Sequence, residues 1–177
     1  MANITADIYQ IMLPRKVYFG MGSVDILSEV DVEPTLPGLN ATGEKLGRES
    51  YGLLVGVGSS MDTTKGLSVL LAHGGRGQDY VGINKIPGPG IPIFTLPTTA
   101  GTGSEVTKAA VFDDPEKRSK FGTQSPYILA RLAIVDPTLT YECPPRVTAT
   151  AGIDALTHAT ESYTSINAST WQRGIHL

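Results

Sequence analysis

Four short apolar runs constrain the fold of this chain more than any other feature of its sequence. They are residues 16–19, 53–57, 91–96 and 132–135, and glycine or proline follows each of them within two residues. Apolar runs of this length, without polar alternation, are typical of strands that are covered on both faces of a parallel sheet. The sequence therefore predicts four strands of an α/β domain.

Helical patterns and one hairpin pattern lie between and after these runs. Residues 61–72 have apolar side chains at helical spacing, with Asp62 in the first turn near the positive end of the helix dipole. Residues 148–163 are rich in alanine and contain no proline, and the Pro-Pro pair before them ends the preceding loop. Residues 106–125 predict a β-hairpin over the sheet, because β-prone residues flank the turn sequence D-D-P-E.

Composition and charge exclude several classes of protein. A chain of 177 residues with 41% hydrophobic content can bury one globular core. The net charge is −3 and no block of Lys or Arg occurs, so we expect neither nucleic acid nor a membrane as partner. The first residues lack the pattern of a signal peptide, and a single cysteine cannot form an internal disulfide. We therefore expect a reducing, cytoplasmic setting.

The first stretch that could carry chemistry is residues 56–65, G-V-G-S-S-M-D-T-T-K, between a predicted strand and a predicted helix. Glycines allow close approach of the backbone, and the amides that open the helix favour an anion, so a pyrophosphate could bind here. The stretch is neither a Walker sequence nor G-x-G-x-x-G, since the third glycine is absent. The alternative is a tight strand-to-helix turn with Ser59 or Ser60 as the helix cap.

The second stretch is residues 97–105, P-T-T-A-G-T-G-S-E, which also follows a predicted strand. Small hydroxyl residues and glycines offer many hydrogen-bond donors and little bulk, which suits contact with a ribose or a phosphate. The alternative is an ordinary surface loop, and composition alone favours that alternative.

The third candidate is the pair Asp154 and His158 on the predicted helix 148–163. Residues four apart emerge on one helix face, one turn from each other. A carboxylate and an imidazole at that spacing can bind one divalent cation, although two ligands do not complete a site. The alternative is an ordinary side-chain pair on the helix surface.

In this order, the three stretches resemble one family, the iron-containing (group III) alcohol dehydrogenases, which are relatives of glycerol dehydrogenase and dehydroquinate synthase. Residues 97–105 match its P-T-T-A-G-T-G-S-E sequence without a change. Residues 56–65 are similar to G-G-G-S-x-x-D-x-x-K, with Val57 in place of the middle glycine. Residues 152–161 resemble the metal helix G-x-D-A-L-x-H-A-x-E. The resemblance implies a partial Rossmann-like parallel sheet with helices and a β-hairpin.

The resemblance also implies a function. Hydride would pass between a small alcohol or aldehyde and the nicotinamide of NAD or NADP, with a divalent metal, iron or possibly zinc, as the second cofactor. Glycine and serine of the first stretch would hold the pyrophosphate, its aspartate would lie near the nicotinamide, and the hydroxyls of the second would line the cofactor cleft. The implied cofactor contacts are Gly58, Ser59, Asp62, Thr98, Thr99 and Ser104. The implied metal ligands are Asp154 and His158.

Two parts of the family pattern are missing from the sequence. A helical second domain would supply two more histidine ligands, and the only later histidine is His176. A strand–helix unit is expected before the glycine stretch, where residues 31–50 are polar and turn-rich instead. We therefore expect an incomplete nucleotide-binding domain at 1–147, and the first helix of a metal-binding helical domain with a short tail at 148–177.

These omissions leave more than one function open. One hypothesis is a truncated and impaired alcohol dehydrogenase, and its alternative is a non-catalytic remnant that serves as a nucleotide-binding or oligomerising module. A lyase related to dehydroquinate synthase fits residues 97–105 less well. The face that the missing helices would cover is expected to promote self-association, so a homo-oligomer is a further prediction.

Overall fold

The computed structural model describes residues 16–19, 35–47, 51–166 and 168. Its strands are β1 (Lys16–Phe19), β2 (Leu54–Val57), β3 (Gly82–Ile83), β4 (Ile93–Leu96), β5 (Ala109–Asp114), β6 (Ser119–Gln124) and β7 (Leu132–Val135). Its α-helices are α1 (Leu36–Leu46), α2 (Ser60–His73) and α3 (Pro145–Thr164). Short 3-10 turns are η1 (Gly77–Tyr80), η2 (Ser104–Val106), η3 (Pro126–Ile128) and η4 (Pro137–Thr140).

The four predicted strands form one parallel sheet in the order β1-β7-β4-β2. Strands β1 and β7 have the predicted bounds, whereas β2 begins one residue later than predicted and β4 two residues later. The register pairs Val57 of β2 with Leu96 of β4, so these two strands end side by side. The glycine turn (residues 56–60) and the hydroxyl loop (residues 97–105), which follow these strands, therefore start at one edge of the sheet.

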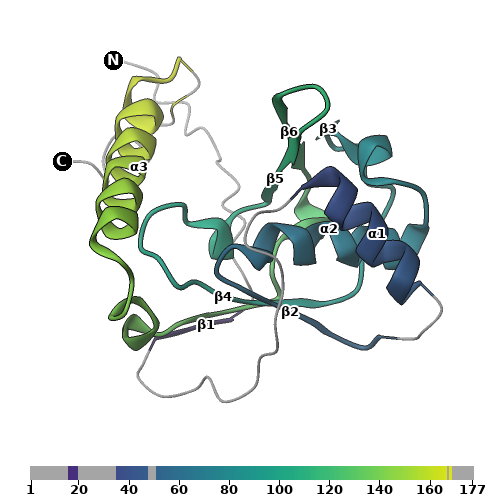
Figure 1. Ribbon diagram of the computed structural model, residues 1–177, viewed down its shortest axis with the longest axis horizontal. Helices are drawn as coiled ribbons and strands as arrows, with labels where there is room; N and C mark the ends of the chain where they lie inside the picture. Colours follow the sequence, from purple (N-terminus) through teal and green to yellow (C-terminus); the bar gives the residue numbers. More distant parts are fainter. Residues whose placement is uncertain (1–15, 20–34, 48–50, 167, 169–177) are drawn as a thin grey trace, which may run out of the picture.

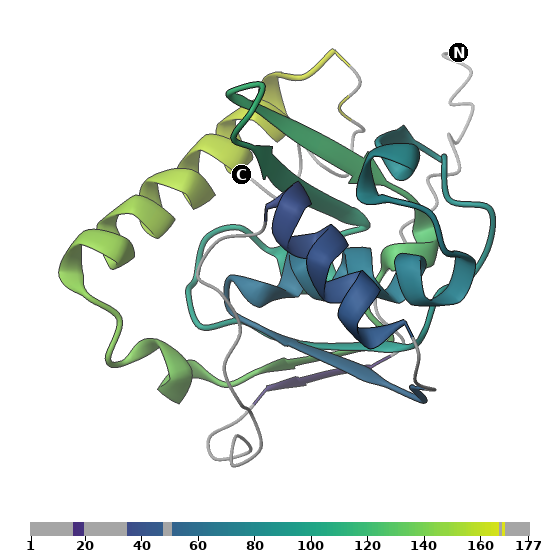
Figure 2. The ribbon, with the colours of Figure 1, turned by 45° about the vertical axis from the view of Figure 1, so that its right-hand side comes forward.

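Helices α1 and α2 lie on the same side of this sheet, with α2 against the strands and α1 outside it (Figures 1 and 2). The core between them and the hairpin is apolar and continuous. Its buried members are Leu36, Leu39, Leu67, Val69, Leu70, Ile86, Ala110, Phe112 and Ile128. Gly66 of α2 allows the close approach of α1, because a Cβ atom there would lie 2.7 Å from Leu39 Cδ2. None of the described helices is both long and apolar enough to cross a membrane.

Helix α1 corrects the expectation that residues 31–50 are only turn-rich, and no strand accompanies it in the described part of that range. Thr35 caps this helix by accepting a hydrogen bond from the Gly38 amide at 3.1 Å, and Pro37 occupies its first turn, where the missing N–H costs nothing. Leu36 and Leu39, three residues apart, are both buried against α2. Tertiary packing of these leucines therefore overrides the weak helix propensity of the prolines and glycines around them.

The hairpin prediction is confirmed with narrower bounds, since the two strands span residues 109–124. Strands β5 and β6 pair in antiparallel fashion from Ala109–Gln124 to Asp114–Ser119, and the short β3 adds to β6 to give a separate three-stranded sheet. At the turn, the Asp114 carboxylate accepts hydrogen bonds from the amides of Glu116 and Lys117, as turn aspartates commonly do. The hairpin lies on the same side of the parallel sheet as α2 (Figure 1).

Candidate functional site

The glycine turn and the hydroxyl loop are in direct contact. Gly58 has a φ of 52°, a conformation that favours glycine, and its amide donates a hydrogen bond to the Leu96 carbonyl at 2.8 Å. A Cβ atom at Gly58 would lie only 2.5 Å from Thr98 Oγ1. Any larger residue at position 58 would therefore push the two loops apart.

The two serines of the turn have different roles. The Ser60 hydroxyl donates to the Val57 carbonyl and accepts from the Val57 amide, both at 2.9 Å, so it is used to close the turn. Ser59 is exposed at the amino end of α2, and its side chain makes no capping hydrogen bond. The tight turn of the alternative is therefore present, but neither serine side chain caps the helix. The Ser59 hydroxyl is left at the positive end of the helix dipole.

A second connection between the two loops is made by the side chain of Asp62. Its Oδ1 atom accepts a hydrogen bond of 2.6 Å from the Ser104 hydroxyl, and its Oδ2 atom accepts one of 2.9 Å from the Val111 amide. These bonds tie the first turn of α2 to the end of the hydroxyl loop and to strand β5. In this arrangement both carboxylate oxygens of Asp62 are engaged by the protein itself.

The side chain of Lys65 adds further hydrogen bonds to this connection. Its side chain is fully buried, and its Nζ atom donates to the carbonyls of Ser104 and Ala109 at 2.7 and 2.6 Å and to the Ser104 hydroxyl at 2.9 Å. Asp62 Oδ1 lies 3.6 Å from the same nitrogen. Burial lowers the pKa of Lys65 from its ordinary value, although the carboxylates of Asp62 and Glu105 favour its charged form.

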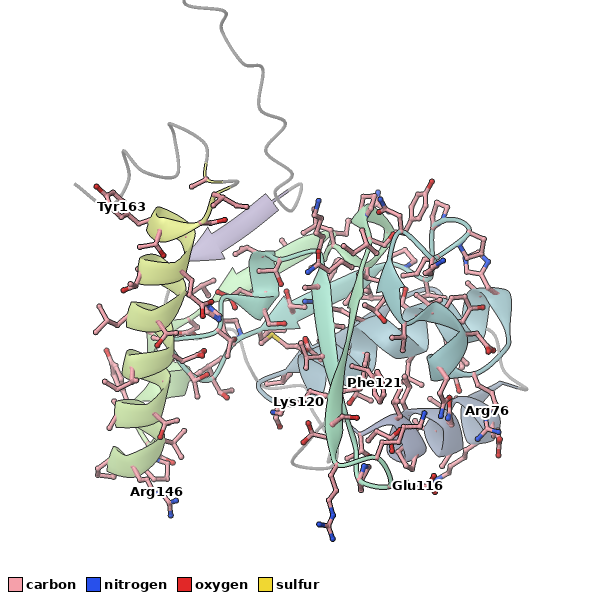
Figure 3. All side chains as sticks on the ribbon, turned by 90° about the horizontal axis from the view of Figure 1, so that it is seen from above. Arg76, Glu116, Lys120, Phe121, Arg146 and Tyr163 are labelled. Carbon is pink, nitrogen blue, oxygen red and sulfur yellow. The ribbon has the colours of Figure 1, made fainter. Side chains whose placement is uncertain are left out.

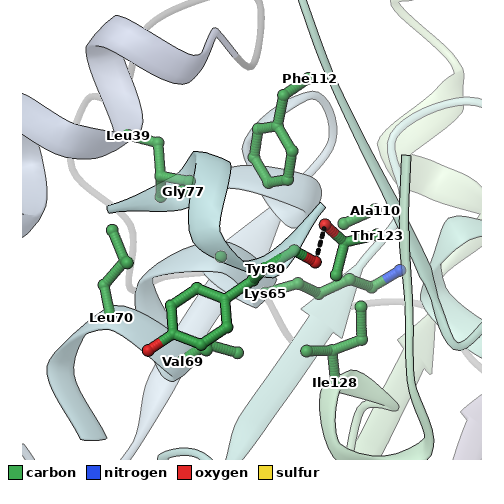
Figure 4. Close-up of a pocket in the computed structure, with 11 residues that line it drawn as sticks. Leu39, Lys65, Val69, Leu70, Gly77, Tyr80, Ala110, Phe112, Thr123 and Ile128 are labelled. Atoms are coloured by element: carbon green, nitrogen blue, oxygen red, sulfur yellow. Dashed lines mark hydrogen bonds between the residues drawn. The ribbon is translucent and has the colours of Figure 1, made fainter. Parts of the chain in front are cut away.

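The methylene stem of Lys65 lies among apolar residues of the core. Figure 4 shows the stem beside Ile128, Val69 and Ala110, with the nitrogen extending beyond them. These residues help to line a small cavity in which about 20 Å³ is open to the centre of a water-sized sphere. That is close to the least volume that holds a single water, roughly 10–15 Å³, so the cavity is a packing gap and not a ligand site.

The rest of the hydroxyl loop is held by short local bonds. Gly103 has a φ of 63°, and the Thr102 hydroxyl accepts a hydrogen bond from the Ser104 amide at 3.2 Å. Thr98 and Thr99 are half-buried at the start of the loop. Thr98 lies against the glycine turn, since its Oγ1 is the atom nearest to a Cβ atom built at Gly58, and Thr99 follows it in the loop.

Helix α3 stands beside the hydroxyl loop and has no buried residue along its whole length. It begins three residues earlier than predicted, at Pro145, because proline is tolerated in the first turn of a helix. Asp154 and His158 lie on it as the spacing predicts, with Oδ1 and Nε2 3.8 Å apart and both side chains partly exposed. Figure 3 shows the side chains of α3, from Arg146 to Tyr163, projecting around a helix that lies apart from the hairpin.

One close contact joins α3 to the hydroxyl loop. A Cβ atom at Gly101 would lie 2.5 Å from the Ala151 carbonyl oxygen, so only glycine allows this approach. Asp154 is three residues after Ala151 and therefore lies on a neighbouring part of the same helix face. Ala151 and Asp154 are half-buried, whereas Ile153 on the other face is 65% exposed. The face of α3 that carries the Asp–His pair is thus turned toward the loop.

We expect Gly101→Ala to displace α3 without unfolding the domain, because none of the helix is buried. The free energy of unfolding should change by less than about 1 kcal/mol, while the amide NMR shifts of residues 148–158 should change together. Gly152→Ala is the matched control, since a Cβ atom there meets nothing within 4 Å. Shift changes confined to the hydroxyl loop would contradict the contact.

The structure brings together most of the predicted site residues. Gly58, Ser59, Asp62, Thr98, Thr99 and Ser104 all lie on the two adjoining loops or on the first turn of α2. Their individual cofactor roles stay predictions. The sequence reasoning gave no separate role to Lys65 or to the Val111 amide, although a lysine on the apolar face of 61–72 marks a buried charge that needs partners. His176 lies outside the described residues.

The donor groups at the two places suit different ligands. The hydroxyls and the amino end of α2 lie beside a turn in which position 58 accepts only glycine. This combination suits a phosphate group. Carboxylate and imidazole suit a divalent cation. Across the described ranges, no group of three or more His, Cys, Asp or Glu side chains is placed to hold a metal ion. Asp154 and His158 therefore fit a metal as two of its ligands, and further ligands must come from elsewhere.

Comparison with known proteins places the chain among relatives of one kind. The family model described as iron-containing alcohol dehydrogenase matches residues 14–137. Sulfoacetaldehyde reductase of Bilophila wadsworthia is 39% identical over 146 residues, which is 81% of this chain. A crystal structure of 1,3-propanediol oxidoreductase superimposes with a TM-score of 0.83 and 27% identity over 96% of this chain. Sulfoacetaldehyde reductase of Bifidobacterium kashiwanohense, solved in complex with NAD+, gives 0.69 and 30% over 85%.

The matches also show how much of each relative this chain represents. It spans 38% of the length of the Bilophila reductase, 56% of the propanediol oxidoreductase chain and 46% of the Bifidobacterium reductase. The shared part is the α/β part with its parallel sheet, and the chain does not cover the carboxy-terminal helical domain of those structures.

Proposed function

The chain belongs to the iron-containing alcohol dehydrogenase family, and from this premise we propose that it binds NAD or NADP between the glycine turn and the hydroxyl loop. We further propose that it provides two metal ligands, Asp154 and His158, to an oxidoreductase that acts on a small alcohol or aldehyde. The names of the relatives, a sulfoacetaldehyde reductase and a 1,3-propanediol oxidoreductase, support a small polar substrate.

One observation carries the cofactor proposal: two loops that follow neighbouring parallel strands are fixed to each other at both ends. Gly58 contacts Thr98 at the start of the hydroxyl loop, and Asp62 with Lys65 holds Ser104 at its end. Ligands of open α/β sheets commonly bind beyond the carboxyl ends of the strands. A fixed pair of loops at that edge presents its hydroxyls in one geometry, which lowers the entropic cost of binding.

Each part of the site supports a different part of the ligand. The Ser59 hydroxyl and the amino end of α2 would bind the pyrophosphate, whose charge the helix dipole favours. Thr98, Thr99 and Ser104 would line the cleft beside the ribose and nicotinamide, and Asp62 would act there by holding Ser104. When bound, the nicotinamide supplies hydride acceptance and a divalent cation supplies polarisation of the alcohol oxygen.

We also propose that the chain divides into two parts. Residues 1–147 would make up the incomplete nucleotide-binding domain, and residues 148–177 would belong to a helical domain with the metal site. The absence of buried residues from α3 supports this division, although the boundary falls inside the first turn of that helix. The exposed apolar side chains of α3, among them Ile153 and Leu156 at 65% and 63%, also support self-association, which light scattering would test.

The first test separates cofactor binding from turnover. We expect the purified chain to bind NAD or NADP in titration calorimetry, and His158→Ala to leave that affinity unchanged while it weakens ferrous or zinc ion binding. Loss of a direct ligand should cost at least as much as loss of an outer partner, about 10–100-fold. His73→Ala is the matched control, because His73 ends α2 and contacts the carbonyls of Gly88 and Pro89 instead.

Nicotinamide absorbance with small alcohols then distinguishes the two functions. Turnover that His158→Ala removes, and that His73→Ala leaves intact, would support a working dehydrogenase whose metal site is completed by other ligands. Dinucleotide binding without turnover would support the alternative, a non-catalytic nucleotide-binding module. This alternative is favoured by the pair Asp154 and His158, which no third ligand side chain joins among the described residues. A folded chain that binds neither dinucleotide would contradict the proposal.

A further inference from the structure

The number of hydrogen-bond donors on Lys65 matches the number of its close acceptors. An ammonium group has three N–H donors and no acceptor. Three oxygen atoms lie within 3.0 Å of Nζ, namely the carbonyls of Ala109 and Ser104 and the hydroxyl of Ser104. Thr107 Oγ1 at 3.4 Å and Asp62 Oδ1 at 3.6 Å lie farther away. All three protons are therefore committed to the hydroxyl loop and the start of β5.

This arrangement leaves Lys65 no free donor for a ligand. Its side chain is fully buried, and Figure 4 shows the stem among apolar residues of the core. The ammonium group at its end donates to Ser104. A dinucleotide that approaches the exposed Ser59 would meet the loop and not the lysine. The lysine of the family sequence in residues 56–65 is thus placed to act on the loop rather than on a phosphate.

The same loop residue connects the lysine to Asp62. The Ser104 hydroxyl accepts from Lys65 Nζ and donates to Asp62 Oδ1, so it is held from both sides. Asp62 is itself oriented by the Val111 amide on β5. Helix α2 thus bonds to the loop at this hydroxyl through side chains of both charges. The same two side chains bond to strand β5 at the Val111 amide and the Ala109 carbonyl.

We infer that Lys65 is a positioning residue: it sets the hydroxyl loop for the dinucleotide through Ser104 and makes no contact with the cofactor. The predicted effect on cofactor binding rests on the proposed function. The predicted order of the loop in the free protein does not depend on any ligand. Removal of the ammonium group should therefore loosen the loop in the free protein as well as weaken cofactor binding.

The first experiment measures the loop without a ligand. In Lys65→Met, hydrogen exchange should accelerate at the amides of Val106 and Thr107, which bond to the carbonyls of Gly103 and Ser104 in the wild type. The Gly74 amide, bonded to Leu70 at the far end of α2, should exchange as before. Lys108→Met is the matched control, because Lys108 is exposed on the same segment. Unchanged exchange at Val106 and Thr107 would overturn the inference.

The second experiment measures dinucleotide affinity in a double-mutant cycle of Lys65→Met and Ser104→Ala. If the lysine acts through the serine, the dinucleotide affinity of the double variant should be only a little lower than that of the single variant that binds more weakly. The total loss relative to the wild type should be about tenfold. If the lysine contacts a phosphate, the two fold-losses should multiply, and that result would overturn the inference. A wild type that binds no dinucleotide would refute the proposed function, while the exchange experiment would still decide the role of Lys65.

Poor folding of Lys65→Met would not leave the inference undecided. Ser104→Ala changes a half-buried loop residue and removes the hydroxyl that joins Lys65 to Asp62. Exchange at Thr107 should then accelerate while exchange at Gly74 stays unchanged. Equal protection of Thr107 in Ser104→Ala and in the wild type would show that the lysine and aspartate do not order the loop through this serine.

Discussion

Gly58→Ala is expected to abolish measurable dinucleotide binding and to lower the free energy of unfolding by about 2–5 kcal/mol. Two costs combine in this estimate. A non-glycine residue in the left-handed conformation, here a φ of 52°, costs about 1–2 kcal/mol. Overpacking adds about 1–3 kcal/mol, because the new Cβ atom would lie 2.5 Å from Thr98 Oγ1. Relief of that contact separates the two loops that form the proposed cleft. Urea unfolding and calorimetric titration would measure the two losses.

Gly103→Ala is the matched control for this prediction. Gly103 has a similar φ of 63°, but a Cβ atom there meets nothing within 4 Å. We expect it to show the conformational cost alone, about 1–2 kcal/mol. The double variant Gly58→Ala with Thr98→Ala removes the two atoms nearest to the new Cβ atom, Thr98 Oγ1 and Cγ2, and should recover the overpacking part of the loss. Equal costs at Gly58 and Gly103 would contradict the proposed contact between the loops.

The second large effect is expected for Lys65→Met, which should lower the free energy of unfolding by about 2–3 kcal/mol at neutral pH. Methionine keeps the apolar stem but provides no donor for the carbonyls of Ser104 and Ala109, which accept bonds of 2.7 and 2.6 Å in the wild type. Asp62 loses its nearby cation but keeps the Val111 amide and the Ser104 hydroxyl.

This loss should grow as the pH rises. The pKa of Lys65 is lower in the folded chain than its ordinary value of 10.5, because the charged form is buried. Between these two values the unfolded chain holds a proton that the folded chain has released, so the stability of the wild type rises with pH. Methionine does not titrate, and all other groups are shared by the two chains. The difference in stability between wild type and variant should therefore widen from neutral pH toward 10.5.

Urea unfolding of both chains over that pH range measures this difference. Lys108→Met is again the control, since Lys108 is an exposed lysine on the same segment. A gap between wild type and Lys65→Met that stays constant up to pH 10.5 and narrows only above it would mean that the pKa of Lys65 is raised by its carboxylate partners and not lowered by burial.

Local sequence patterns were sufficient to predict most of the fold. The predicted strands at 16–19 and 132–135 match β1 and β7 residue for residue, because the glycine and proline that follow these runs mark where each strand ends. Helix α1 was missed for the opposite reason. Its sequence contains proline and glycine, and its stability comes from burial of Leu36 and Leu39 against α2, which a local pattern does not reveal.

The site was predictable in its loops but not in its connections. Glycine and hydroxyl residues after strands marked both loops, and the structure places these loops side by side. The bonds from Asp62 and Lys65 to Ser104 join residues about forty positions apart in the chain, and spacing within one helix does not reveal such partners. A lysine on the apolar side of a helix indicates only that some partner exists.

The packing of α3 determines how substitutions of the proposed metal ligands, Asp154 and His158, can be detected. A helix with no buried residue contributes little to the cooperative unfolding of the body beside it. Substitution of Asp154 or His158 should therefore leave the melting temperature of the α/β part where it was, even when metal affinity is lost. Thermal shift screens would not detect such variants, and the proposed affinity of the pair for a metal ion could change without a cost to the folding of the α/β part.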